Sequence, residues 1–145
     1  MNVLVDTSIW SLAFRRSHAS SRSDTKMVEE LTDLIQECRA LLIGPIRQEL
    51  LSGISDVRQF NTLRNRLRAF NDLSINELDY ERAAEFSNSC RRAGVQGSHI
   101  DFLICSVAAG SSAAILSTDK DFIRYAKHLP ITLHEARTRG RESHR

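Results

Sequence analysis

The chain has 145 residues, the length of one ordinary domain, and can bury a hydrophobic core without disulfides or a structural metal. Hydrophobic residues make up 41% and charged residues 26%, and no apolar run approaches the roughly 20 residues of a transmembrane helix. This composition argues against a disordered or membrane-bound protein, and three cysteines without a CxxC pair argue against a disulfide framework or a zinc site. Because the N-terminus lacks the features of a secretory signal, we expect a cytoplasmic protein.

The first forty residues predict one strand and two helices. Residues 2–5 are a short apolar run typical of a strand, and residues 7–14 carry apolar side chains at helical spacing. The small and polar residues 17–23 predict a loop. The apolar stripe within residues 27–38 then predicts an amphipathic helix, which Asp24 or the serine before it can cap.

The middle of the chain predicts a second strand and two helices. Residues 40–43 are apolar, and the glycine and proline that follow favour a short helix over residues 45–52, closed by Gly53. Apolar residues recur at helical spacing from residue 56 to residue 70. The exposed face of this helix is basic, with Arg58, Arg64, Arg66 and Arg68.

The next segment predicts a possible strand and two further helices. Residues 72–75 are compatible with a short strand, and the apolar spacing from Leu78 onward predicts a helix that ends near Gly94. Residues 98–109 predict a compact apolar helix closed by Gly110.

The remaining elements complete an alternating pattern. Residues 114–117 predict a strand, Asp119 opens a helix, and residues 131–133 predict a last strand. Strands separated by helices indicate parallel βαβ units, and hence a three-layer α/β/α sandwich with a mostly parallel sheet of four to five short strands. We expect one domain over residues 1–133, followed by a polar, basic tail over residues 134–145.

Four acidic residues fall where strands end or helices begin. They are Asp6, Glu49, Asp101 and Asp119. In a parallel sheet the strand ends and the helix starts share one edge, so we expect these side chains to converge there. Crowded carboxylates repel one another, and the commonest ways to keep them ionised are a hard divalent cation or a supporting cationic group nearby.

Each acid also has an ordinary structural explanation. Asp6 could cap the helix that begins at residue 7, and Glu49 could be a solvated surface charge. The segments 98–101 and 118–121 both fit a capping box, which explains Asp101 and Asp121 without chemistry. Four unrelated caps would have no reason to share one edge, so the pattern favours a metal site.

Four segments around these acids are similar to the successive motifs of one family. They are DTSIW at residues 6–10, RQELLSG at residues 47–53, DFLICSVA at residues 101–108 and LSTDKDF at residues 116–122. Their order and spacing resemble PIN-domain ribonucleases, and within that family the VapC-type toxins of toxin–antitoxin modules.

The resemblance implies a metal-dependent endoribonuclease. Asp6, Glu49, Asp101 and Asp119 correspond to the family's acidic site, which would hold Mg²⁺ or Mn²⁺ and hydrolyse RNA phosphodiester bonds. Asp121 is a frequent fifth acid, and Ser8 and Thr118 match supporting hydroxyl positions. All candidate ligands are oxygen donors, which agrees with such an ion. We expect Asp6 and Asp101 to be the principal ligands, while His99 is a less favoured candidate for moving a proton.

The resemblance also implies partners. A cognate VapB-type antitoxin would block the acidic pocket, the toxin would form a homodimer, and DNA would be contacted only through the antitoxin. The surface suits a polyanion, because 20 Lys and Arg face only 14 acids once the four candidate ligands are set aside from the total of 18. The alternatives are a housekeeping PIN-type RNA-processing nuclease and a non-catalytic module that binds RNA or an antitoxin.

Overall fold

The structure, a computed structural model, describes residues 1–14 and 21–138. Its centre is a parallel sheet of four strands in the order β2-β1-β3-β4. The strands are β1 (Val3–Val5), β2 (Ala40–Leu41), β3 (Ala114–Leu116) and β4 (Thr132–Leu133). The helices in the described residues are α1 (Thr7–Phe14), α2 (Arg22–Gln36), α3 (Gly44–Leu51), α4 (Val57–Leu67), α5 (Glu77–Arg92), α6 (His99–Gly110) and α7 (Asp121–Ala126).

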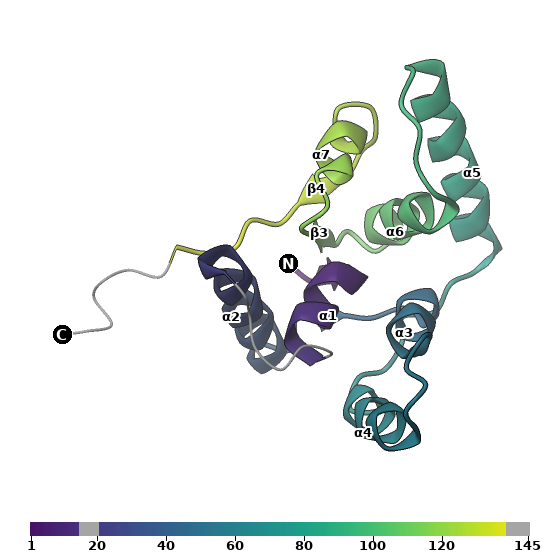
Figure 1. The fold of residues 1–145 in the computed structure, drawn as a ribbon. Helices are drawn as coiled ribbons and strands as arrows, with labels where there is room; N and C mark the ends of the chain where they lie inside the picture. Colours follow the sequence, from purple (N-terminus) through teal and green to yellow (C-terminus); the bar gives the residue numbers. More distant parts are fainter. Residues whose placement is uncertain (15–20, 139–145) are drawn as a thin grey trace.

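The helices form layers on the two sides of the sheet. Figure 1 shows α2 on one side and the α5–α6 pair on the other. Helix α1 packs on α2 and α3, whereas α6 packs on β1 and β3 and is covered in turn by α5. The three-layer α/β/α sandwich with a parallel sheet that the sequence predicts is therefore confirmed.

The strand order reverses direction at the centre of the sheet. The chain passes from β1 to β2 on one side, and from β3 to β4 on the other side. Val5 pairs with Leu116, and the N–H of Asp6 extends the ladder by donating to the Leu116 carbonyl at 2.9 Å. In open α/β sheets, diverging connections leave a crevice at the carboxyl ends of the two central strands. Asp6 stands at that crevice.

The two central strands are buried on both faces. Every residue of β1 and β3 is buried, which explains their continuous apolar sequence. Trp10 on α1 is also fully buried, and its indole N–H donates to the Val5 carbonyl at 3.0 Å. Phe14 and Phe70 meet its ring edge-on, at centroid distances of 5.5 and 5.0 Å. Asp6, which directly follows β1, is thus attached to a tightly packed part of the core.

Two glycines end their helices as the sequence predicts, and a third does not. Gly53 and Gly94 adopt φ angles of 86° and 78° after α3 and α5. After α6 the left-handed residue is Ser112, with a φ of 54°, and Gly110 is the last helical residue. A Cβ at Gly110 would lie 2.5 Å from the Arg82 guanidinium of α5, so a larger residue there would displace the Arg82 side chain.

Two further expectations differ from the structure. Residues 72–75 form a single bridge, Leu42 to Asp72, in place of a strand, and the Asp72 carboxylate is instead engaged by Arg47 at 2.8 Å. Helix α2 begins before Asp24, because Ser21 caps it by accepting a hydrogen bond from the Asp24 N–H at 3.0 Å. Of the predicted loop 17–23, residues 17–20 lie outside the described residues.

The chain after β4 returns to α2. Glu30 of α2 is 1% exposed, and it is contacted by His134 Nε2 at 2.6 Å and by Arg137 Nε at 3.1 Å. Arg137 also binds Glu37 at 2.6 Å. The first residues of the predicted tail therefore lie against α2. Within the described residues, every helix is too short or too polar to span a membrane.

Candidate active site

Asp6 is held at the crevice by two hydroxyl groups. Ser8 donates to Asp6 Oδ2 at 3.1 Å, and Ser117 donates to the same oxygen at 2.7 Å. Ser117 directly follows β3, and its hydroxyl also accepts from the Asp119 N–H at 3.0 Å. The Thr118 N–H donates to the Ser8 hydroxyl at 3.3 Å. These bonds join the ends of β1 and β3 and fix one Asp6 oxygen, and a hydrogen bond from the Thr7 backbone N–H also holds the carboxylate.

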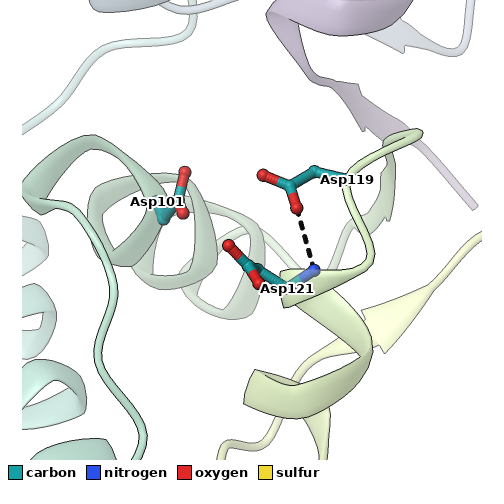
Figure 2. Close-up of side chains that lie close together, drawn as sticks. All are labelled: Asp101, Asp119 and Asp121. Atoms are coloured by element: carbon teal, nitrogen blue, oxygen red, sulfur yellow. Dashed lines mark hydrogen bonds between the residues drawn. The ribbon is translucent and has the colours of Figure 1, made fainter.

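Three other carboxylates converge beside Asp6. Asp101 lies in the first turn of α6, Asp119 lies in the loop after β3, and Asp121 is the first residue of α7. One oxygen from each lies within 4.8 Å of the other two. Figure 2 shows the three side chains, here called the acidic triplet, pointing toward one shared space. Asp119 Oδ1 accepts from the Asp121 N–H at 2.9 Å, which orients the turn that carries both.

Glu49 approaches from the other side of the crevice. It lies on α3, and its Oε2 accepts a hydrogen bond from the Thr7 hydroxyl at 3.1 Å. Thr7 is the first residue of α1, next to Asp6, so this bond draws the α3 carboxylate toward the strand ends. Among the described residues, Glu49 and Asp6 stand outside the tight triplet. Glu49 acts electrostatically on Asp6, and Asp6 acts on Asp101.

The acids perturb one another electrostatically. Burial raises the pKa of Asp6 above its usual range, and the charge of Glu49 adds to that rise, while the Ser117 and Ser8 hydroxyls oppose it. Burial also raises the pKa of Asp101, and the charges of Asp6 and Asp119 add to it. All four acids named from the sequence thus lie in one electrostatic neighbourhood. Asp121, the fifth acid that the resemblance implies, belongs to the triplet itself.

The donor set fits a hard divalent cation. Two oxygen ligands of an octahedral Mg²⁺ are separated by up to about 4 Å, so the 4.8 Å limit of the triplet is close to a coordinating arrangement. Carboxylate oxygens are the ligands that Mg²⁺ and Mn²⁺ prefer. Asp121 is also paired with Arg124 at 3.2 Å, and that pair would compete with coordination.

Sequence reasoning missed three residues that shape the site. Ser117 binds Asp6, Thr7 binds Glu49, and the Tyr125 hydroxyl donates to Asp101 Oδ2 at 2.7 Å. Burial, together with the Asp101 charge, raises the pKa of Tyr125 and keeps its hydroxyl a donor. A signal existed for Ser117, which lies at the predicted strand end. None existed for Tyr125, because the contact joins two helices.

His99 and two arginines of the basic α4 face line grooves that contain no residue of the triplet. His99 lines a groove of 520 Å³ between α5 and α6, with Tyr80 and Leu103 among its neighbours. Arg58 and Arg66 line a separate groove of 580 Å³ beside the end of α1, and the Arg66 guanidinium stacks on a phenylalanine ring there at 4.5 Å.

Comparison with known proteins identifies the family of this fold. The PIN domain family model matches residues 3–128. A VapC ribonuclease of Mycobacterium bovis is 30% identical over 122 residues, which cover 83% of this chain and 88% of that protein.

Solved structures with the same fold extend the comparison. The structure of FitAcB from Neisseria gonorrhoeae matches with a TM-score of 0.74 at 19% identity, covering 92% of this chain and 97% of that one. VapBC2 from Rickettsia felis, bound to a DNA fragment from its promoter, matches with a TM-score of 0.68 at 16% identity, covering 92% and 98%. The family model and the 30% identical relative establish that the chain belongs to the PIN-domain family, among the VapC ribonucleases.

Proposed function

We propose that this chain is a metal-dependent endoribonuclease that acts as the toxin of a toxin–antitoxin module in the cytoplasm. The observation that carries the proposal is the convergence of five acids on the β1/β3 crevice, three of them within 4.8 Å of one another. Such a group fits Mg²⁺ or Mn²⁺ and a phosphodiester substrate. Because the family includes VapC ribonucleases, we propose that the substrate is RNA.

The acids take different places around the crevice. Asp101, Asp119 and Asp121 would hold the cation, Asp6 would add a ligand beside Asp101, and Glu49, bonded to Thr7, would complete the site. A bound divalent cation would neutralise charge on the scissile phosphate and make a water molecule more acidic. Ser8 and Ser117 fix the orientation of Asp6. An ionised carboxylate of the pocket accepts the proton of the attacking water.

The partners follow from the same proposal. Two solved structures of this fold are FitAcB and DNA-bound VapBC2. By analogy we propose a VapB-type antitoxin that covers the acidic pocket, a toxin homodimer, and DNA contact only through the antitoxin. A surplus of Lys and Arg outside the pocket would attract RNA by charge.

RNA cleavage by the purified chain tests the proposal. We expect cleavage in Mg²⁺ or Mn²⁺, none in EDTA, and a loss of at least about 100-fold in Asp101→Asn, because a ligand charge is removed. Asp56→Asn is the matched control. It removes the same charge, yet asparagine caps α4 as well as aspartate does. Cleavage that persists in EDTA, or an equal loss in the control, would contradict the proposal.

Expression in a bacterial host tests the toxin role separately. We expect growth arrest by the wild-type chain, none by Asp101→Asn, and relief by a small DNA-binding protein encoded beside it. Normal growth with active enzyme would favour a housekeeping nuclease.

A further inference from the structure

Tyr125 is buried beside the acidic triplet, and its hydroxyl donates to Asp101. The side chain is 0% exposed, and the 2.7 Å bond from its hydroxyl to Asp101 Oδ2 joins α7 to α6. Helix α7 therefore delivers two groups to the site, the Asp121 carboxylate at its start and the Tyr125 hydroxyl one turn later.

The ring of Tyr125 is fixed by aromatic neighbours. Phe102 lies at a centroid distance of 5.1 Å and Phe122 at 5.4 Å, the latter nearly perpendicular at 82°. A phenol held on two sides cannot swing away without opening the core, so the position of its oxygen is set by packing.

The loop before α6 closes the third side. A Cβ added at Gly97 would lie 2.4 Å from the Tyr125 oxygen and 2.9 Å from Phe102 Cζ, which is too close for any real side chain. Glycine is needed there for space. The loop thus closes over the hydroxyl end of the ring, whose hydrogen bond runs to Asp101.

The bond constrains what Asp101 can do. With Oδ2 accepting from Tyr125, rotation of the carboxylate is restricted, and one Asp101 oxygen is held in the shared space of the triplet. Ser98 holds the backbone of the same residue by accepting from the Asp101 N–H at 3.1 Å. Both the main chain and the side chain of Asp101 are therefore oriented before any ion arrives.

We propose that Tyr125 is a positioning residue for the metal site, acting through its hydrogen bond to Asp101 to preorganise that carboxylate for a divalent cation. The inference rests on the proposed function, since it requires that Asp101 bind the ion. Tyr125 lies outside the four acidic motifs, so the proposal extends the metal site beyond them. Loss of a partner that orients a ligand typically weakens metal binding by about 10- to 100-fold.

Direct Mn²⁺ binding tests the proposal without reference to cleavage. The electron paramagnetic resonance signal of free Mn²⁺ is titrated against wild type, Tyr125→Phe, Asp101→Asn and Tyr80→Phe. Tyr80→Phe is the matched control, because Tyr80 is 56% exposed and lies on α5. We expect Tyr125→Phe to raise the Kd for Mn²⁺ by about 10- to 100-fold and Tyr80→Phe to leave it unchanged.

A double-mutant cycle separates positioning from a general loss of packing. Adding Tyr125→Phe to Asp101→Asn should change the Kd no further, because the oriented charge is already gone. RNA cleavage by Tyr125→Phe should recover at saturating Mn²⁺, with the KM for RNA unchanged. A wild-type Kd in Tyr125→Phe, or an equal effect in the Asp101→Asn background, would overturn the proposal.

A measurement on the native sequence covers the case in which Tyr125→Phe does not fold. The chain has two tyrosines, so ¹³Cζ labelling gives two resonances that Tyr80→Phe assigns. We expect Mg²⁺ to shift the Tyr125 resonance and not that of Tyr80, and two unshifted resonances while Mg²⁺ binds would overturn the proposal. Wild type that binds no Mn²⁺ would instead defeat the proposed function, so the two failures are distinguishable.

Discussion

Replacing Asp101 with asparagine should stabilise the metal-free protein. The substitution keeps the shape of the side chain and an oxygen that can accept the Tyr125 bond, but removes one charge from the acidic triplet. At a separation of 4.8 Å, each pair of like charges costs about 0.9 kcal/mol in a water-like medium and about 3.5 kcal/mol at an effective dielectric constant of 20. Asp119 is exposed to solvent, so the water-like repulsion of about 0.9 kcal/mol per pair applies.

The expected net gain is about 1 kcal/mol. Relief of repulsion from Asp119 and Asp121 stabilises the variant by about 2 kcal/mol. The hydrogen bond from Tyr125 is weaker to a neutral amide than to a carboxylate, which destabilises the variant by about 1 kcal/mol. For a chain of this length the melting temperature should rise by about 3 °C in EDTA.

The pH dependence has a defined sign. The pKa of Asp101 is raised above its ordinary value of 3.8, so the folded state favours the protonated carboxyl. The stability that this side chain contributes is fully present below pH 3.8 and is lost as the pH rises through the raised pKa. The advantage of Asp101→Asn should therefore grow as the pH increases above 3.8.

Magnesium should reverse the order of stability. At a concentration 100 times the Kd, Mg²⁺ stabilises the wild type by about 2.7 kcal/mol, or about 8 °C, whereas Asp101→Asn gains far less. Thermal melts in EDTA and in Mg²⁺, with Asp56→Asn as the control, measure both effects. A variant that is less stable than wild type in EDTA, or one that Mg²⁺ stabilises equally, would refute the reasoning.

Two further predictions concern residues away from the site. Glu30→Gln should lower the free energy of unfolding by about 2 kcal/mol in urea titrations, because Glu30 accepts charge-assisted bonds from His134 and Arg137. The pKa of Glu30 is lowered from 4.5, so the stability that its carboxylate contributes is present above pH 4.5 and is lost as the pH falls through the lowered pKa. If Glu30→Gln lost stability at acid pH as the wild type does, the pairing of Glu30 with His134 and Arg137 would be contradicted. Gly94→Ala should cost about 1 kcal/mol from its φ of 78° alone, since a Cβ there meets nothing within 4 Å, and no loss would count against the left-handed turn.

The sequence predicts the sheet and its edge well because both depend on local patterns. Buried parallel strands are continuous apolar runs, and β1 and β3 are such runs, each followed closely by a candidate acid. From these alone the convergence of Asp6 and Asp119 follows. The position of Glu49 could not be predicted in this way, because no local pattern shows that Thr7 donates a hydrogen bond to it.

The remaining features depend on contacts between distant residues. A capping box would explain Asp121 from the sequence, but in the structure Asp119 accepts from its N–H and its carboxylate joins the triplet. Residues 72–75 fail as a strand because one bridge and the Arg47 ion pair replace a ladder. Tyr125 is an ordinary core aromatic by periodicity, and only its distance from Asp101 indicates more.

Anomalous scattering from crystals of the wild-type chain grown with Mn²⁺ would test the central claim most directly, because it locates the ion itself. We predict a peak in the space shared by Asp101, Asp119 and Asp121, within coordination distance of at least two of their carboxylates. A peak elsewhere on the molecule, with the triplet empty at saturating Mn²⁺, would contradict the account.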